Sequence, residues 1–140
     1  MKDFMNEKLM YRLIEEEGMK LKPYRCSAGK LTIGVGRNLE DKGLSNEEAL
    51  FLLQNDIIEA VKELKKAFLF FDSLNETRQI VLIDMCFNLG INGLKKFKKM
   101  IKALENKDFS LASKEMLSSC WAKQVGARAR SLALLMETGE

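Results

Sequence analysis

Apolar residues recur every three to four positions near the start of the chain, which predicts an amphipathic helix over residues 4–17. Leu9 and Leu13 mark its apolar stripe, and Glu17 falls on the same stripe one turn further on. Gly18 follows directly and is typical of the residue at which a helix stops. The first predicted element therefore ends with a carboxyl group on its apolar face.

The pattern changes to short apolar and polar alternation over residues 21–39, where Gly34 and Gly36 stand among apolar residues. This pattern predicts a small antiparallel hairpin or three-stranded sheet, with its first turn at residues 27–30. Residues 40–44 then form a charged connection.

A second helical pattern begins at the capping box Ser45-Asn46-Glu47-Glu48 and continues to about residue 68. Its apolar positions keep helical spacing: Leu50, Leu53, Ile57, Val61, Leu64 and Phe68. A helix of this length is suited to join two lobes.

A repeat of the S-x-x-E pattern at Ser73 predicts the cap of a helix that ends at Gly90. The segment Ile80–Phe87 is almost wholly apolar, so this helix is predicted to be buried on all sides. A buried strand is the competing interpretation, and the length of the segment disfavours it because strands average about 5–6 residues. Further helices are predicted at about residues 94–104, 108–119 and 127–137.

The predicted fold class is α+β and mostly helical, with the small sheet inserted after the first helix. Residues 1–140 are expected to form a single domain with two lobes. The sheet-containing lobe covers about residues 19–56, and the helical lobe covers about residues 1–18 plus 66–140. The long helix at about residues 45–68 joins them.

The residue types exclude several kinds of chemistry. The chain contains no histidine, so Ser-His-Asp and Cys-His mechanisms are excluded, and acid–base chemistry falls to carboxylates, thiols, lysines or tyrosines. Cys26, Cys86 and Cys120 are odd in number and widely spaced, which argues against a disulfide framework or a zinc site. We expect reduced thiols, with Cys86 and Cys120 as buried small hydrophobes, and neither a metal nor an organic cofactor.

The formal net charge of +3 is placed unevenly, because residues 71–140 carry 11 basic and 8 acidic side chains while residues 1–70 carry 12 of each. The densest basic run consists of Lys95, Lys96, Lys98, Lys99 and Lys102. Such a run suits an anionic polymer, although a solvated helix face is the commoner explanation.

The N-terminal residues lack the continuous apolar segment of a secretory signal, and no apolar run approaches the roughly 20 residues that span a bilayer. We therefore expect a cytoplasmic protein, unless something else releases it, with no stable membrane association. We also expect a monomer.

Glu17 is the candidate general acid. A carboxyl group on an apolar face is partly removed from water, and the negative end of the helix dipole lies there too. Both effects favour the protonated form, which a general acid needs near neutral pH. The alternative is a glutamate that only borders the core or pairs with a basic side chain.

The glycine-containing segment Thr32–Gly36 does not fit a phosphate-binding loop. Leu39 stands where the third glycine of G-x-G-x-x-G would be, and no Walker lysine follows. A tight turn between short strands explains these glycines better.

Several motifs together resemble the phage-type lysozymes, glycoside hydrolase family 24, over essentially the whole chain. The spacing from Glu17 to Cys26 to Thr32 matches the family's catalytic Glu-x8-Asp-x5-Thr pattern. The other matching residues are Gly18, Lys22, Tyr24, Gly29, Ile33-Gly34-Val35-Gly36, Phe87-Asn88-Leu89-Gly90, Trp121, Gln124, Arg128 and Thr138-Gly139.

The resemblance implies roles for individual residues. Glu17 would be the general acid, Thr32 would hold or activate the attacking water, and Arg128 would pair with Glu17, with Arg130 as an alternative. Phe87 and Asn88 would line the sugar-binding cleft. Core packing for Phe87 and a polar position near a helix end for Asn88 explain these two residues equally well.

Cys26 departs from the family pattern, which most often has aspartate there. A free thiol with a pKa near 8.5 is mostly neutral at pH 7, so it does not automatically stabilise a cationic transition state. Three roles remain open for Cys26: attack on the anomeric carbon as a thiolate, deprotonation of water beside Thr32, or no role in a weakened site.

The predicted function is hydrolysis of the β-1,4 bond between N-acetylmuramic acid and N-acetylglucosamine in bacterial peptidoglycan. The resemblance implies that the protein reaches the periplasmic wall from the host cytoplasm, after release through a phage holin. A lytic transglycosylase and a non-catalytic peptidoglycan-binding module are the alternatives. Nucleic acid is not expected as a partner, because the cationic excess is modest and no recognition-helix motif is present.

Overall fold

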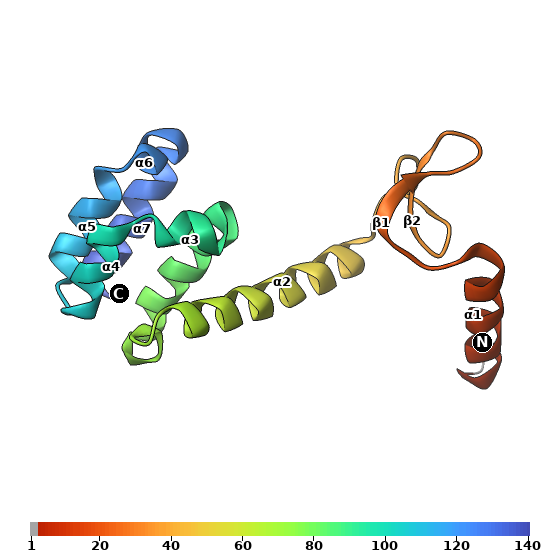
Figure 1. Ribbon diagram of the computed structural model, residues 1–140, viewed down its shortest axis with the longest axis horizontal. Coiled ribbons are helices and arrows are strands. Elements are labelled where there is room, and N and C mark those ends of the chain that lie inside the picture. The colour runs from red at the N-terminus through yellow and green to blue at the C-terminus, as the bar shows by residue number, and fades with distance from the viewer. Residues whose placement is uncertain (1–2) are drawn as a thin grey trace. The chain divides into compact units, whose positions relative to one another are not determined.

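The computed structural model describes residues 3–140 (Figure 1). The chain folds as two compact units, Met1–Phe51 and Leu52–Glu140, which we call the N-terminal and the C-terminal unit. The observed class is α+β and mostly helical, as predicted, with seven α-helices and one three-stranded antiparallel sheet in the described residues.

The N-terminal unit begins with helix α1, Asp3–Glu17. Gly18 ends the helix in the left-handed conformation, with φ of 77°, and its backbone N–H donates to the carbonyl of Ile14 at 2.7 Å. The predicted first helix and its stop are therefore confirmed, and Glu17 is the last helical residue.

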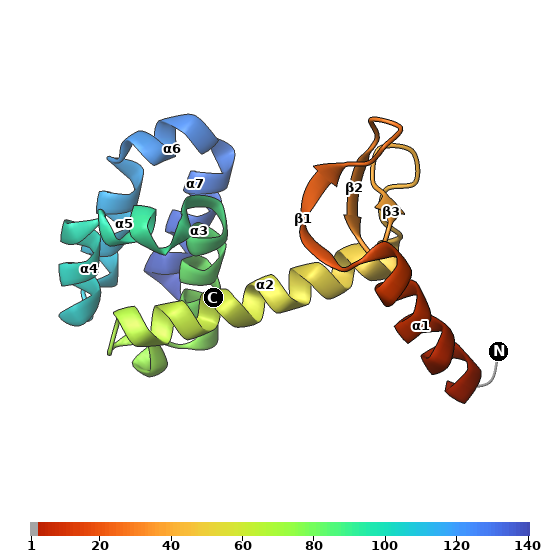
Figure 2. The same cartoon turned by 45° about the vertical axis from the view of Figure 1, so that its right-hand side comes forward.

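Three strands follow α1 in the order β1-β2-β3: Lys20–Arg25, Leu31–Gly34 and Arg37–Asn38 (Figure 2). The central strand β2 pairs antiparallel with both neighbours, so Thr32 lies opposite Tyr24 on β1 and opposite Asn38 on β3. The β1–β2 register shifts between Lys20 and Tyr24, in the stretch that contains Pro23. Proline lacks the N–H that a regular ladder needs, so an irregular edge strand is its usual place.

The β1–β2 turn falls at the predicted residues 27–30. It is closed by two hydrogen bonds: the N–H of Cys26 donates to the carbonyl of Lys30 at 3.0 Å, and the N–H of Gly29 donates to the carbonyl of Cys26 at 2.8 Å. Cys26 therefore lies between the end of β1 and the start of the turn.

Helix α2, Asn46–Ala67, begins at the predicted capping box. The N–H of Ser45 donates to Glu48 Oε1 at 2.8 Å, and the N–H of Glu48 donates to Ser45 Oγ at 3.1 Å. This reciprocal pair satisfies two N–H groups that have no partner within the helix. The boundary between the two units falls inside α2, between Phe51 and Leu52.

The cap predicted at Ser73 is wrong by two residues. Ser73 lies in a short 3-10 helix, Phe71–Ser73, and its Oγ donates to the carbonyl of Phe70 at 2.6 Å. Helix α3, Glu76–Lys95, is instead capped by Asn75, whose Oδ1 accepts from the N–H of Arg78 at 3.0 Å. The 3-10 turn uses Ser73 locally, so the cap passes to the next polar residue that can accept.

Gly90 interrupts α3, with φ of 74° and ψ of 162°, but the helix resumes and continues to Lys95. The prediction that this helix is buried on all sides is wrong, because Ile80 is 50% exposed and Phe87 is 51% exposed. Its buried face consists of Val81, Leu82, Met85, Cys86 and Leu94.

The remaining helices are α4, Lys98–Glu105, α5, Phe109–Leu117, α6, Cys120–Val125, and α7, Ala127–Thr138. The predicted helices at 108–119 and 127–137 are confirmed. The predicted helix at 94–104 is divided, because α3 ends at Lys95 and α4 begins at Lys98. Helix α6 was not predicted from the sequence; it is capped by Ser119, whose Oγ accepts from the N–H of Ala122 at 3.2 Å.

The helices of the C-terminal unit enclose one apolar core. Its largest fully buried side chains are Phe71, Leu64, Leu82, Met85, Leu94, Met100, Leu104, Met116, Met136 and Val81. Burying one such side chain stabilises a fold by about 1.5–3 kcal/mol relative to leaving it exposed. This core fixes the positions of the exposed side chains of α3, α6 and α7.

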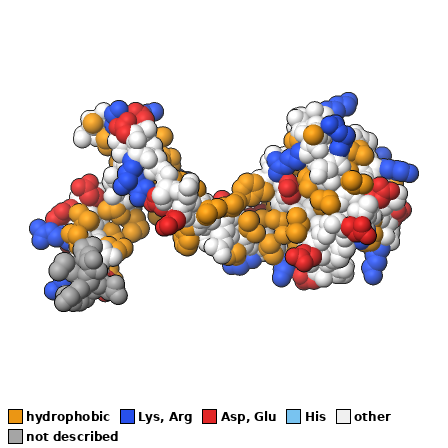
Figure 3. Space-filling view, turned by 180° about the vertical axis from the view of Figure 1, so that it is seen from behind, with side chains coloured by type: hydrophobic (Ala, Val, Ile, Leu, Met, Phe, Trp, Pro, Cys, Tyr) orange, Lys and Arg blue, Asp and Glu red, His pale blue; other side chains and the backbone are white. Residues whose placement is uncertain are grey.

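Apolar side chains also gather on the surface (Figure 3). The exposed ones on α2 are Leu50, Phe51, Leu52, Leu53, Ile57 and Ile58. Among residues 3–140, none of the helices combines the length and the apolar character needed to cross a bilayer.

Candidate functional site

Glu17 lies next to the β2–β3 turn. If a Cβ atom is placed on Gly36, it falls 3.3 Å from Glu17 Oε2, so the carboxylate lies against the bare backbone of this turn. The two residues meet because β1 begins at Lys20, only three residues after Glu17, and Lys20 pairs with Gly34. The sheet register thus brings the end of α1 to the turn that follows β2.

The burial predicted for Glu17 is not found within the N-terminal unit, where its side chain is exposed. Leu9 and Leu13, on the same stripe of α1, are themselves 43% and 39% exposed. The stripe has the predicted pattern, but the described residues of this unit leave it partly exposed. The expected removal of the carboxyl group from water therefore has no source among those residues.

Thr32 is the most buried polar residue of the sheet, with 3% of its surface exposed. Its Oγ1 donates to the carbonyl of Lys30 at 2.8 Å. The pairing of β2 with strands on both sides holds its backbone, so the hydroxyl group has a fixed position at the start of the central strand.

Cys26 is half-buried at the β1–β2 turn, and its environment lowers the pKa of its thiol below the usual value. The largest cause is hydrogen bonding from the backbone of Lys30, followed by the backbone of Ala28. The side chain of Thr32 adds a further hydrogen bond, while partial burial opposes the shift. Donors that point at the sulfur favour the thiolate, so this turn stabilises a negative charge where the family pattern places aspartate.

Cys26 and Thr32 are thus in contact, and the Thr32 hydroxyl has one proton for two acceptors. It can donate to the carbonyl of Lys30 or to the sulfur of Cys26. Donation to the sulfur is favoured once the thiol is ionised, since a charged acceptor makes the stronger hydrogen bond. The structure therefore brings together two of the three predicted catalytic residues, and places Glu17 in the same unit.

Arg37 and Glu48 form a pair in this unit that the sequence analysis did not identify. Arg37 Nη1 donates to Glu48 Oε1 at 2.8 Å, and Nη2 lies 2.7 Å from Oε2. These contacts lower the pKa of Glu48 to about 2. The Arg37 guanidinium is the largest cause, and the capping-box contacts of Ser45 come next. This pair ties β3 to the first turn of α2.

Arg128 lies on α7 in the C-terminal unit and binds Asp84 of α3. Its Nε donates to Asp84 Oδ1 at 2.9 Å, and Nη2 contacts the same carboxylate and donates to the Asp84 carbonyl at 3.4 Å. Asp84 was not predicted as the partner of Arg128, because 44 residues separate the two side chains along the chain. The predicted pair of Arg128 with Glu17 stays a prediction.

Phe87 lies on the exposed side of α3 and lines an apolar groove of about 310 Å³. The groove residues are Leu53, Ile57, Ile80, Ile83, Asp84, Phe87 and Arg128. The alternative that Phe87 is a core residue is therefore wrong, because half of its surface is exposed.

Asn88 is next in the chain, and its Oδ1 accepts a hydrogen bond from the indole Nε1 of Trp121 at 2.9 Å. The contact joins α3 to α6 and fixes the orientation of the Asn88 amide. Both residues match the family pattern, but their contact was not predicted from the sequence.

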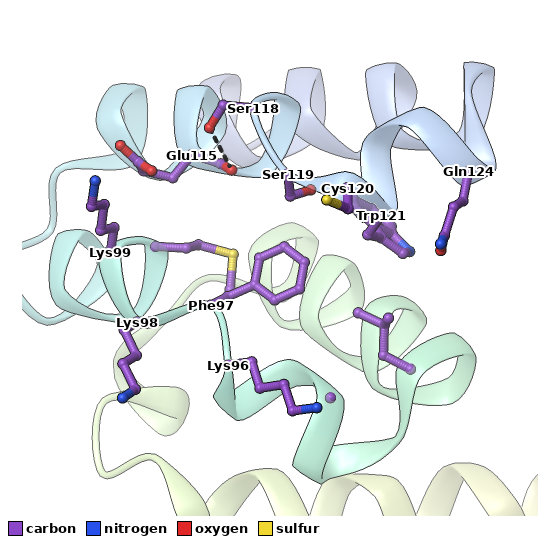
Figure 4. A pocket seen from close by; sticks show the side chains of 13 residues that line it. Lys96, Phe97, Lys98, Lys99, Glu115, Ser118, Ser119, Cys120, Trp121 and Gln124 are labelled. Atoms are coloured by element: carbon purple, nitrogen blue, oxygen red, sulfur yellow. Dashed lines mark hydrogen bonds between the residues drawn. The ribbon is translucent and has the colours of Figure 1, made fainter.

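A larger open pocket of about 760 Å³ lies between the start of α4 and helices α5 and α6 (Figure 4). Lys96, Lys98 and Lys99 line one side, and Trp121 and Gln124 come from α6 on the other. The basic run found in the sequence thus borders this pocket beside two residues that match the family. Sequence periodicity could not place the lysines there, because the pocket depends on how three helices pack.

The two cysteines outside the sheet differ from each other. Cys86 is buried, as predicted, and its burial, with a smaller effect of the Glu63 charge, raises the pKa of its thiol. The prediction that Cys120 is buried is wrong: it is exposed and lines the 760 Å³ pocket. It opens α6, and Trp121 takes the buried position instead.

In the part of the chain that the structure describes, no three histidine, cysteine or carboxylate side chains gather in a way that could hold a metal ion. No residue is therefore assigned to a metal.

Comparison with known proteins identifies the family. A model of the phage lysozyme family matches residues 14–135. Two relatives are a probable T4-type lysozyme of Dictyostelium discoideum, 27% identical over 89% of this chain and 90% of its own, and an endolysin of Acyrthosiphon pisum secondary endosymbiont phage 1, 28% identical over 89% of this chain and 85% of its own. A third, the pre-baseplate central spike protein of Enterobacteria phage T4, is 26% identical over 98% of this chain but only 29% of its own length.

The family match covers most of both units and includes all six of the predicted site residues. The chain therefore belongs to the phage lysozyme family and is a lysozyme-type peptidoglycan hydrolase.

Proposed function

We propose that this hydrolase is an N-acetylmuramidase that cleaves the β-1,4 bond between N-acetylmuramic acid and N-acetylglucosamine, with Glu17 as the general acid. One observation carries the proposal: Cys26, with its lowered pKa, is in contact with the buried hydroxyl of Thr32. Both residues stand at the spacing from Glu17 that the family's catalytic pattern requires.

The contact favours one of the three roles that the sequence leaves open for Cys26. A thiolate that accepts a hydrogen bond from Thr32 is placed to take a proton from a water held by the same hydroxyl group. The water oxygen then bonds to the anomeric carbon while the bond from that carbon to the bridging oxygen breaks. The water proton goes to the Cys26 sulfur, and the Glu17 proton goes to the bridging oxygen.

This mechanism predicts inversion at the anomeric carbon, because water attacks from the face opposite the leaving sugar. Attack by the sulfur itself would give retention through a thioglycosyl intermediate. Proton NMR of the first product anomer distinguishes the two: an initial α-anomer supports water attack, and an initial β-anomer contradicts it.

Glu17→Gln tests the acid. The variant keeps a side chain of the same size but has no proton to donate, so we expect a folded protein whose lytic activity falls by about 10²–10⁴-fold. Full activity in a folded Glu17→Gln variant would refute the assignment. Mass spectrometry of the fragments checks the reaction class: a free reducing end supports hydrolysis, and an anhydro-sugar would indicate a lytic transglycosylase.

Residues of the C-terminal unit are proposed to bind the glycan. Phe87 offers an exposed aromatic ring, and Asn88 offers amide N–H groups held in place by Trp121. Aromatic rings and amides are suited to the apolar faces and hydroxyl groups of sugars. Truncating either residue to alanine should raise KM more than it lowers kcat, because it removes binding and not the reacting groups.

We further propose that the protein acts as a monomer on the periplasmic wall after release from the host cytoplasm, without nucleic acid or a membrane as a stable partner. Fractionation of host cells before and after lysis begins tests the location. Size-exclusion chromatography with light scattering tests the oligomeric state.

A further inference from the structure

We propose that Gly36 is a positioning residue for the Glu17 carboxylate, an inference that rests on the proposed role of Glu17 as the acid. The backbone of the β2–β3 turn lies so close to the carboxylate that a Cβ atom at position 36 would lie 3.3 Å from Glu17 Oε2, and the carboxylate would have to shift by a few tenths of an ångström.

Gly34 and Gly36 have almost the same positive φ, 69° and 68°. This left-handed region disfavours residues with a Cβ atom, so each glycine has a backbone reason to be present. Their surroundings differ. A Cβ on Gly34 would meet nothing within 4 Å, whereas a Cβ on Gly36 would lie 3.3 Å from Glu17 Oε2, 3.7 Å from Cδ and 3.8 Å from Cγ.

The turn cannot easily retreat from such a contact. Ile33 and Arg37 pair across the turn. Arg37 directly follows Gly36 and is held by two short contacts with Glu48. Glu17 is an exposed side chain with several rotatable bonds. The carboxylate would therefore move, and the turn would stay.

Movement of the carboxylate matters for catalysis far more than for folding. An exposed side chain that shifts slightly loses little stability, but a catalytic group must be held within about 0.5 Å of its productive position, and a displacement of about 1 Å can slow a reaction by about 10²-fold. Glycine at position 36 thus has two effects: it permits the positive φ of the turn, and it leaves room for the Glu17 carboxylate against the backbone.

The two glycines form a matched pair for the experiment. Gly34→Ala introduces only the strain of a side chain at positive φ, and Gly36→Ala introduces such a strain together with the contact on Glu17. We expect the two variants to lose similar thermal stability. We expect Gly36→Ala to lower kcat on purified peptidoglycan by at least tenfold more than Gly34→Ala does, with KM close to that of the unchanged protein.

Gly36→Asn keeps the test decisive if Gly36→Ala does not fold. Asparagine tolerates positive φ better than alanine but still carries a Cβ atom, so it separates the contact from the strain. A loss of kcat in Gly36→Asn with little loss of stability supports the proposal. Equal kcat in the Gly34 and Gly36 variants, or a change in KM alone, overturns it.

Glu17→Gln, assayed in parallel, separates this inference from the proposed function. If Glu17→Gln is fully active, the proposed role of the acid fails and the inference fails with it. If Glu17→Gln is inactive while the Gly36 variants match Gly34→Ala, only the positioning role fails.

Discussion

A cysteine at the position of a catalytic aspartate needs help that an aspartate does not. A carboxyl group is ionised at neutral pH without any partner, whereas a thiol is not. The β1–β2 turn supplies that help through the backbone of Lys30 and Ala28 and through the hydroxyl of Thr32. The lowered pKa of Cys26 is thus a property of the turn and not of the residue alone.

Replacing Cys26 tests its proposed role as a base. Cys26→Ala should lower kcat by about 10²–10⁴-fold, because no group then accepts the proton of water. In the unchanged protein, kcat should rise with pH through the lowered pKa of Cys26. In Cys26→Asp this rise should move to more acidic pH, because a carboxyl group ionises at a lower pH than a thiol.

The pH dependence of kcat, measured for the three proteins on the same peptidoglycan, checks this prediction. An alanine variant as active as the unchanged protein would leave Cys26 without a catalytic role.

At the residue scale, short-range spacing predicted site residues, but it did not predict contacts between residues far apart in the chain. The positions of Glu17, Cys26 and Thr32 follow from short-range sequence, and the structure places Cys26 and Thr32 in contact. The partner of Arg128 and the contact between Asn88 and Trp121 join residues far apart in the chain. No periodicity within a single helix contains that information.

Arg78 is the clearest example of one side chain that joins several elements. Its Nε donates to the carbonyl of Met136 at 2.7 Å and its Nη2 to that of Glu137 at 2.9 Å, at the end of α7. Its guanidinium also lies 3.6 Å from the ring centre of Phe109 on α5. The last carbonyls of a helix have no partner within it, so a cation there satisfies them and favours the helix dipole.

Arg78→Ala should therefore lower the free energy of unfolding by about 2–4 kcal/mol, since hydrogen bonds to a charged group contribute about 1.5–3 kcal/mol each and are not fully additive. Arg78→Lys should recover only part of the loss, because an ammonium cannot reproduce the planar fork. Urea unfolding of both variants measures the difference, and an alanine variant of unchanged stability would refute the role.

The pair between Arg37 and Glu48 predicts a pH-dependent stability. Glu48 has a folded-state pKa of about 2, below the ordinary value of about 4.3. Its contribution is therefore complete above the ordinary pKa and is lost as the pH falls from about 4.3 towards 2. Glu48→Gln should be less stable than the unchanged protein at pH 6, and the difference should shrink towards pH 2.

Glu47→Gln is the matched control, because Glu47 is the exposed neighbour on the same turn of α2. Thermal unfolding from pH 2 to pH 6 should show no comparable pH-dependent difference for this variant. A Glu48→Gln difference that stays constant with pH would contradict the assignment.

Elements were predicted well where one local signal acts alone. The capping box at Ser45 is such a case, because both of its hydrogen bonds lie within four residues. The cap predicted at Ser73 was wrong because a 3-10 turn uses its hydroxyl group. Helix α6 was not predicted because its six residues are too few to show a helical period.

For the whole molecule, the excess of positive over negative charge lies in the last third of the chain. The three lysines at the 760 Å³ pocket belong to a region where basic residues outnumber acidic ones. Peptidoglycan carries carboxylates on its peptides, so this surface should speed the encounter between enzyme and wall. The effect belongs to the field of many charges and not to one contact.

Lys99→Glu should therefore lower kcat/KM several-fold at low ionic strength, and the loss should fade towards 0.5 M salt, because the Debye length then shrinks to about 4 Å. Lys62→Glu makes the same change of charge on α2, away from the pocket, and should have a smaller effect. Turbidity assays across a salt series compare the two, and equal effects would argue against the pocket.

The fold class and the small sheet after the first helix were predicted from the sequence and are confirmed. Hydrophobic periodicity determines these features within short segments. The assignment of residues 1–18 to the helical lobe stays a prediction, as does the description of residues 1–140 as one domain with two lobes. Such assignments depend on contacts between distant segments, on which local patterns carry little information.

The core of the C-terminal unit is rich in sulfur, with Met85, Met100, Met116 and Met136 almost fully buried, while Met10 and Met19 in the N-terminal unit are exposed. Peroxide converts an accessible thioether to a sulfoxide, and a buried one reacts only when its surroundings open. The oxidation rate of the exposed methionines therefore reports the strength of the oxidant, and the oxidation rate of the buried ones reports how often the helical core opens.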